Sequence, residues 1–179
     1  MKLIIITGMP GAGKSEIADS ALDLDIPVIV MGDIIRELTR TKGLEPTHEN
    51  TRTTMLQLRE ESGPGAVAKI CLNSLLNLNY DVVVIEGCRS LDEVEVFRSH
   101  TDDLVIVGVH ASPTTRFKRL QDRDRSDAPV DWPSFRERDL REISVGLGGV
   151  IAMSDIMILN ETSLEEFRSK CKSTMRELI

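Results

Sequence analysis

The chain has 179 residues, 41% of them hydrophobic and 28% charged, which is typical of a folded domain and excludes a disordered chain. Its net charge of −7 and aromatic content of 3% argue against a protein that coats nucleic acid, because such binding needs a basic surface and stacking platforms. No apolar run approaches the ~18 residues of a membrane span, and three scattered cysteines predict free thiols, so we expect a cytoplasmic protein.

Five short apolar runs, rich in β-branched residues, predict the strands of a parallel sheet that is covered by helices on both faces. They lie at residues 3–6, 28–30, 82–85, 104–107 and 156–159. Helical patterns separate them, at about 15–23, 33–42, 48–62, 64–78, 91–99, 113–124, 134–144 and 164–178. The alternation predicts an α/β fold with a doubly wound, three-layer, five-stranded parallel sheet, whose ligands bind beyond the carboxyl ends of the strands. Two departures are expected, a helical insert at about 33–80 and an arginine-flanked lid loop at about 124–133.

The first strand leads directly into a full match to the P-loop pattern GxxxxGK[ST], and a helical pattern follows. The match is Gly8, Met9, Pro10, Gly11, Ala12, Gly13, Lys14 and Ser15. Its glycines let the backbone curl so that N–H groups point at phosphate oxygens, and the next helix presents its positive N-terminus to the same anion. Lys14 would bridge the β- and γ-phosphates, and the Ser15 hydroxyl would ligate Mg²⁺. We therefore predict one P-loop domain over residues 1–179 that binds a nucleoside triphosphate with Mg²⁺.

Charged residues follow the second strand, in the segment MGDIIRE at 31–37. Asp33 could cap the next helix, and Arg36 could pair with a carboxylate on the helix surface. Their position at the carboxyl end of a strand near the P-loop also fits a role in ligand binding. Both interpretations stay open at this point.

The third strand ends in a charged segment, Glu86-Gly87-Cys88-Arg89. In a sheet of this type the third strand lies beside the first, so Glu86 could orient Mg²⁺ through water as a Walker-B carboxylate does. The alternative is a solvated charge at a strand end. Gly87 would let a substrate approach the backbone, and Arg89 could reach a second phosphate.

Arginines gather on either side of the predicted lid loop. Arg116, Arg119 and Arg123 stand at i, i+3 and i+7 and share one helix face, while Arg125, Arg136, Arg138 and Arg141 lie within or after the loop. Interspersed carboxylates favour an ordinary salt-bridged surface for any one of them. As a group they are typical of a lid that closes over a moving phosphoryl group and neutralises its charge. Spacing does not decide which arginines act.

The last strand ends at Asn160, which could hydrogen-bond a base edge or cap the next turn. His48, His100 and His110 are isolated from one another and from any nucleophile, so no histidine is expected to be catalytic.

These motifs resemble those of the nucleoside monophosphate kinase superfamily, and more closely those of the archaeal adenylate-kinase-related family that is likened to dephospho-CoA kinase. The resemblance covers nearly the whole chain. It includes GMPGAGKSE at 8–16, MGDIIRE at 31–37, LREESGPGAVA at 58–68, EGCRS at 86–90, HASPTTRFKRL at 110–120, RSDAP at 125–129, ERDLRE at 137–142, GLGGVIAMSD at 146–155 and ILN at 158–160.

The resemblance implies roles for the charged residues. Arg36, with Asp33 in the same motif, and Arg89 would contact the phosphate of the acceptor. Arg119 and Arg123 are similar to lid arginines that grip the donor phosphates, and Arg138 to the arginine that follows the lid. Asn160 falls in the segment that lies beside the donor adenine in relatives.

The chain also departs from these families. Adenylate kinases usually carry Asp-Gly-Phe-Pro-Arg where this chain has Glu86-Gly87-Cys88-Arg89, and the aspartate-rich acceptor segment of dephospho-CoA kinases is missing. We therefore expect an ATP-dependent phosphotransferase that acts on a nucleoside monophosphate or a similar small acceptor. A CoA-precursor kinase and a slow ATPase that regulates a partner are the alternatives, and homodimerisation stays open.

Overall fold

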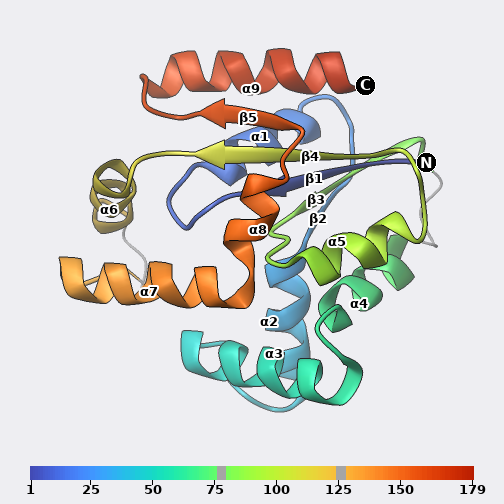
Figure 1. Cartoon of the computed structure of the whole chain (residues 1–179), viewed down its shortest axis with the longest axis vertical. Helices are drawn as coiled ribbons and strands as arrows, with labels where there is room; N and C mark the ends of the chain where they lie inside the picture. The colour runs from blue at the N-terminus through green and yellow to red at the C-terminus, as the bar shows by residue number, and fades with distance from the viewer. Residues whose placement is uncertain (76–79, 124–127) are drawn as a thin grey trace.

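The computed structural model describes residues 1–75, 80–123 and 128–179, which form a five-stranded parallel sheet flanked by helices (Figure 1). The strands are β1 (Lys2–Thr7), β2 (Val28–Val30), β3 (Val82–Glu86), β4 (Leu104–His110) and β5 (Ile156–Leu159). Their order is β2-β3-β1-β4-β5, so Ile5 of β1 lies opposite Ile85 on one side and Ile106 on the other. The predicted strands, and the predicted place of the third strand beside the first, are confirmed.

Both faces of β1 are completely buried, because successive side chains of a strand point to opposite faces. Ile4 and Ile6 pack in one core cluster with α1 (Lys14–Leu22) and α9 (Leu164–Leu178). Leu3 and Ile5 pack in a second cluster on the other face, against helices that include α5 (Leu91–Arg98). Figure 1 shows these helices on opposite sides of the sheet, which makes the predicted three layers.

The predicted helical insert is present between β2 and β3. It consists of α2 (Met31–Thr41), α3 (His48–Ser62) and α4 (Ala66–Leu75), and residues 76–79, which the prediction placed partly in the last of these helices, lie outside the described residues. The hydroxyl groups of Thr39 and Thr54 are 3.1 Å apart in a buried contact that joins α2 to α3.

The helices after β4 differ from the prediction in three ways. First, α6 (Pro113–Gln121) ends earlier than expected, and residues 124–127 of the predicted lid loop lie outside the described residues. Second, α7 (Trp132–Val145) begins two residues early, because Asp131 forms a capping box with Ser134. Third, the short helix α8 (Leu147–Ala152) was not expected, since two glycines in six residues hide its helical pattern.

Aromatic rings join α6 to α7 on the outside of the sheet. The ring centre of Phe117 lies 5.3 Å from that of Trp132 and 5.4 Å from that of Phe135, which is fully buried. Pairs at such distances add attraction beyond their buried area. The start of α7 is therefore fixed against α6.

The three cysteines are buried and unpaired, as predicted. Burial raises the pKa of the Cys71 and Cys171 thiols to about 12, so neither is a thiolate at neutral pH. Among the described residues, no helix combines the length and the apolar character needed to cross a membrane.

We expect Gly8→Ala to destabilise the protein more than Gly43→Ala does. Both glycines have a positive φ, but a Cβ at Gly8 would overlap the backbone carbonyl of Val109 in β4, whereas a Cβ at Gly43 meets nothing within 4 Å. The difference in the free energy of unfolding should be about 1–3 kcal/mol, the usual cost of overpacking, and urea titration of both variants measures it. Equal losses would mean that only backbone conformation matters at Gly8.

Candidate functional site

The P-loop follows β1 and ends at the first turn of α1. Its glycines adopt backbone conformations that other residues rarely take, with φ of 151° at Gly8, 80° at Gly11 and 105° at Gly13. The amide of Ala12 donates to the carbonyl oxygen of Met9 at 3.1 Å, which closes the turn. The loop therefore has the curled backbone that the motif predicts, directly before a helix N-terminus.

Asn160 at the end of β5 supports the P-loop from beneath. Its side-chain Nδ2 donates to the carbonyl oxygen of Ala12 at 2.8 Å, and its Oδ1 accepts from Nη2 of Arg119 at 3.0 Å. A Cβ on Gly13 would overlap this amide group. Asn160 is buried and its amide is engaged at both ends, so the structure places it against the loop, and its proposed contact with a base remains a prediction.

Arg116 supports the P-loop from the side. Its guanidinium donates to the carbonyl oxygen of Pro10 at 3.2 Å and makes a two-bond ion pair with Asp139 of α7, at 2.8 and 2.6 Å. Nε donates to Ala111 at 3.1 Å, and the guanidinium carbon lies 5.0 Å from the ring centre of Phe135. The arginine is only 3% exposed, so it is part of the protein interior.

The three arginines that share one face in the sequence therefore occupy different surroundings. Arg116 is buried in the ion pair with α7, and Arg119 reaches Asn160 at the P-loop. Arg123 is partly buried just beyond α6, immediately before residues 124–127. Arg125 lies outside the described residues. The structure thus brings Arg119 to the P-loop and shows Arg116 in a structural role that spacing did not predict.

Lys14 closes the loop upon itself. Its Nζ donates to the carbonyl oxygens of Gly8 at 2.8 Å and Met9 at 3.4 Å. Burial lowers the pKa of Lys14 to about 8, because removal from water disfavours the charged amine. Charged side chains act on the same amine: Glu86 and Glu142 raise its pKa, while Arg89 and Arg138 lower it.

Glu86 lies at the end of β3 and is half-buried. Burial raises the pKa of its carboxyl above the usual range, and the carboxylates of Asp19 and Asp33 act in the same direction. Lys14 and Arg36 oppose them, so the P-loop lysine and two of the predicted acceptor residues, Asp33 and Arg36, act on one carboxylate.

The residues fit a magnesium ion that is shared with phosphates. Mg²⁺ in such sites takes one or two protein ligands and completes its shell with phosphate oxygens and water. Glu86 offers a carboxylate whose negative charge is destabilised by burial, and the exposed Ser15 offers a hydroxyl in the first turn of α1. Within the described residues no group of three or more His, Cys, Asp or Glu side chains could hold a metal by itself.

Arg36 forms an ion pair with Asp33, one turn earlier in α2. Both side chains are exposed, at 45% and 65%, so the contact resembles an ordinary surface pair. The pairing that the sequence analysis left open is therefore present, and both charges act on the Glu86 carboxyl.

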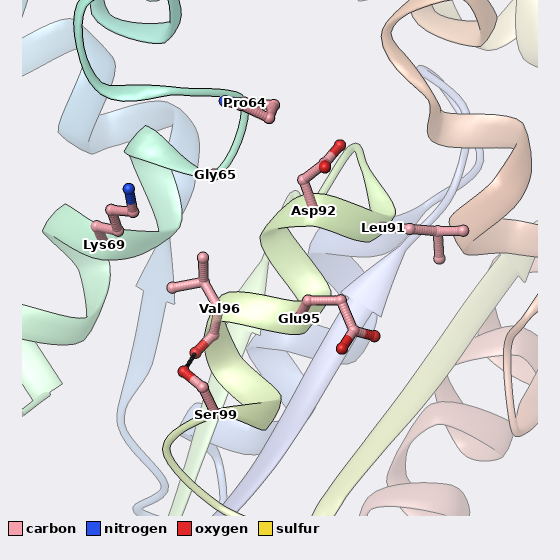
Figure 2. Close-up of a pocket in the computed structure, with 8 residues that line it drawn as sticks. All are labelled: Pro64, Gly65, Lys69, Leu91, Asp92, Glu95, Val96 and Ser99. Atoms are coloured by element: carbon pink, nitrogen blue, oxygen red, sulfur yellow. Dashed lines mark hydrogen bonds between the residues drawn. The ribbon is translucent and has the colours of Figure 1, made fainter.

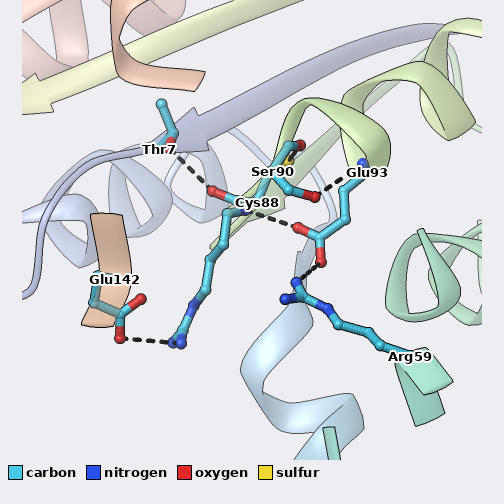
Figure 3. A network of polar contacts seen from close by, with 7 residues as sticks. Thr7, Arg59, Cys88, Ser90, Glu93 and Glu142 are labelled. Atoms are coloured by element: carbon cyan, nitrogen blue, oxygen red, sulfur yellow. Dashed lines mark hydrogen bonds and ion pairs between the residues drawn. The ribbon is translucent and has the colours of Figure 1, made fainter. Parts of the chain in front are cut away.

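Arg89 is held at both its backbone and its side chain (Figure 3). Its amide donates to Oε2 of Glu93 at 2.7 Å, and its Nη1 donates to Oε1 of Glu142 at 3.2 Å. Glu93 is buried and also accepts from Nη2 of Arg59 in α3 at 2.7 Å, while the hydroxyl of Thr7 fixes the neighbouring carbonyl of Cys88 at 3.0 Å.

The sequence analysis missed three of these residues, Arg59, Glu93 and Glu142. Ser90 followed three residues later by Glu93 reads as an ordinary capping box, which hides the second use of the carboxylate. Glu142 reads as one of many charges on an exposed helix, yet its side chain is only 14% exposed.

A groove of about 470 Å³ lies elsewhere, between α4 and α5. Figure 2 shows Lys69 on one side of it and Asp92 and Glu95 on the other. None of its lining residues belongs to the P-loop or to the charged cluster around Lys14. We therefore place the candidate site at the P-loop, where the charges converge.

Comparison with known proteins shows the family to which the chain belongs. A family model described as an AAA domain, AAA_17, matches residues 7–136. The UPF0200 protein of Hyperthermus butylicus is 47% identical, covering 98% of this chain and 94% of that protein, and the one of Thermococcus kodakarensis is 44% identical, covering 99% and 98%.

Solved structures share the fold at low identity. TT1252 from Thermus thermophilus aligns with a TM-score of 0.64 and 19% identity over 99% of this chain and 98% of that one. A shikimate kinase from Bacteroides thetaiotaomicron aligns with a TM-score of 0.61 and 17% identity over 99% of this chain and 98% of that one. A gluconokinase from Sinorhizobium meliloti aligns with a TM-score of 0.57 and 15% identity over 99% of this chain and 93% of that one.

The chain therefore belongs to the AAA domain family and to the archaeal UPF0200 family, and it has a nucleotide-binding fold of the P-loop kinase type. The predicted fold class is confirmed.

Asp139→Asn should destabilise the protein, because it leaves the buried Arg116 guanidinium without its counter-charge. We expect a loss of about 3 kcal/mol in the free energy of unfolding, as for other broken buried pairs. Glu37→Gln, which breaks an exposed 3.1 Å pair with Arg40, is the matched control and should cost less than about 1 kcal/mol. Equal losses in urea unfolding would show that Arg116 does not depend on Asp139.

Proposed function

We propose that this UPF0200 protein is a phosphotransferase that moves the γ-phosphoryl group of Mg-ATP to a nucleoside monophosphate or a similar small phosphate-bearing acceptor. One observation supports this above all: Lys14 of the P-loop lies within electrostatic reach of Glu86 and Arg89, and Glu86 lies within reach of Arg36. One candidate acceptor arginine, Arg36, and the P-loop lysine therefore act on the same carboxylate, and the other candidate, Arg89, acts on that lysine.

The donor side rests on the P-loop. Its amides and the N-terminus of α1 suit the triphosphate, and Lys14 would leave its two backbone carbonyls to bridge the β- and γ-phosphates. Ser15 and Glu86 would hold Mg²⁺, which neutralises phosphate charge during the transfer. Arg119 adds a donor, since its Nη1 is buried without a hydrogen-bond partner among the described residues.

The acceptor side rests on arginines from different elements. Arg36 on α2 and Arg89 after β3 would fix the acceptor phosphate, and Asp33 would orient Arg36. An acceptor phosphate is already a competent nucleophile, so no general base is needed, and positioning with charge neutralisation carries the rate. Arg123 and Arg138 would supply further positive charge as the lid closes.

The cell compartment and the quaternary structure belong to the proposal as well. Three buried free thiols suit a reducing cytoplasm. Leu44 and Leu56, near and within α3, are exposed at 43% and 48%, which supplies apolar surface for a homodimer.

The proposal predicts that Lys14→Ala lowers the rate of phosphoryl transfer at least about a hundredfold, because it removes a positive side chain that stabilises the negative charge of the transition state. The assay supplies labelled Mg-ATP with a panel of acceptors: nucleoside monophosphates, dephospho-CoA, and sugars or acids without phosphate. Arg36→Ala and Arg89→Ala should mainly raise the acceptor KM. Lys170→Ala, an exposed site on α9, is the control.

Each outcome of this assay identifies one function. Transfer to dephospho-CoA alone would favour a CoA-precursor kinase. Slow hydrolysis that no acceptor changes would favour a nucleotide-dependent regulator instead. Normal turnover by the Lys14 variant would contradict the mechanism.

ATP binding should weaken as the pH rises above about 8. The free protein holds the pKa of Lys14 at about 8, and phosphates beside the amine would raise it, so binding takes up a proton between the two pKa values. We expect affinity to fall by up to about tenfold per pH unit there, with proton uptake visible by calorimetry in buffers of different ionisation enthalpy. Lys14→Met should bind more weakly and lose this dependence; a wild-type affinity that is flat from pH 7 to 10 would contradict it.

A further inference from the structure

The end of α7 is packed closely against the loop that carries Arg89. Gly146 ends this helix with a φ of 115°, and a Cβ there would lie 3.3 Å from Cβ of Ser90 and 3.4 Å from the carbonyl oxygen of Arg89. A side chain there would be tight against the loop, and the positive φ also disfavours one. The end of α7 therefore lies in close contact with the loop.

Glu142 stands one turn before Gly146, which places its carboxylate over the Arg89 side chain. The two groups meet at 3.2 Å, and Figure 3 shows Glu142 at the edge of the same polar network as Thr7 and Glu93. The Glu142 side chain is 14% exposed, while that of Arg89 is 44% exposed. The carboxylate is thus sheltered by α7, and the guanidinium presents its remaining donors to solvent.

Positively charged side chains lie near Glu142. Its Oε1 accepts from Nη1 of Arg89 at 3.2 Å, and the charges of Glu142, Glu86, Arg89 and Arg138 all act on Lys14. A phosphate dianion at Arg89 would bring two negative charges where the Glu142 carboxylate brings one.

The other predicted acceptor arginine lacks this arrangement. Arg36 pairs with Asp33 within a single helix, at a spacing where such pairs form without support from elsewhere. Arg89 and Glu142 are 53 residues apart, and their contact depends on the packing of α7 against the loop.

We propose that Glu142 is a specificity-determining residue that occupies Arg89 in the empty site and gives way only to a phosphate group. This inference rests on the proposed role of Arg89 as a ligand of the acceptor phosphate. A phosphate monoester carries up to two charges on three oxygens, so it displaces a carboxylate from a guanidinium. An acceptor that offers only a carboxylate has no such advantage over Glu142, and the site rejects it.

The test measures the binding of inorganic phosphate and of acetate by NMR titration. Glu142→Gln keeps the shape of the side chain and removes its charge, so phosphate should bind about two- to fivefold more tightly, the range expected for one partly exposed pair. Acetate should gain more than phosphate, because a residue that determines specificity must change the ratio of the two affinities. Arg89→Ala and the double variant complete the cycle, because phosphate also binds the P-loop and only an Arg89-dependent gain counts.

Matched controls separate this role from stability. Glu137→Gln lies on the same helix, breaks an exposed 3.3 Å pair with Arg141 and should leave phosphate binding unchanged. Thermal unfolding checks that each variant is folded. If Glu142→Gln does not fold, Glu142→Asp replaces it, because the shorter side chain moves the carboxylate away from Arg89 and keeps its charge. A smaller gain in the same direction is then expected.

Two results would overturn the inference: phosphate binding that is unchanged or weaker in folded Glu142→Gln protein, or a gain that persists in the Arg89→Ala background. The transfer assay with labelled ATP tests the proposed function independently. If no acceptor is phosphorylated by any variant, that function fails, while the phosphate titration still decides the role of Glu142.

Discussion

The P-loop turns its amides toward a ligand, so its carbonyl groups need hydrogen-bond donors from elsewhere, and the structure depends on those donors. Lys14 binds the carbonyl oxygens of Gly8 and Met9, Arg116 binds that of Pro10, and Asn160 binds that of Ala12. A curled loop of this kind keeps its shape only if these acceptors find partners, because unpaired buried polar groups are costly. Two of the partners are fixed protein groups from beyond the loop. The third, Lys14, is free to leave when phosphates replace the carbonyls.

Helix α7 supports both the P-loop and the loop that carries Arg89. Asp139 holds Arg116 beside the P-loop, and Glu142, three residues later on the same helix face, holds Arg89 at the opposite loop. The helix is itself anchored by the aromatic contacts at its start and by Gly146 at its end. A shift of α7 relative to the sheet would therefore change the contacts of both loops together.

The sequence predicted what depends on local pattern. Apolar runs gave the strands, the glycine motif gave the P-loop, and the strand ends gave Glu86 and Arg89. It could not separate Arg116 from Arg119, because both occupy one helix face, and only the folded chain brings Asp139 of α7 to Arg116 and Asn160 to Arg119. The sequence likewise suggested a base contact or a turn cap for Asn160, whereas its side chain donates to the carbonyl oxygen of Ala12 in the P-loop. Helix α8 was missed since its glycines mask the periodicity that packing enforces.

The loop that carries Arg89 shows most clearly why spacing alone was insufficient. The backbone amide of Arg89 is held by Glu93, a buried carboxylate of α5 that also binds Arg59 of α3, and the Arg89 side chain is held by Glu142 of α7. The buried ion pair between Arg59 and Glu93 contributes little net stability by itself, but removing either partner would leave an uncompensated charge in the interior. Arg89 is thus held by α5 and α7, and α5 is in turn tied to α3 of the insert, so the geometry around Arg89 is a property of the assembled fold.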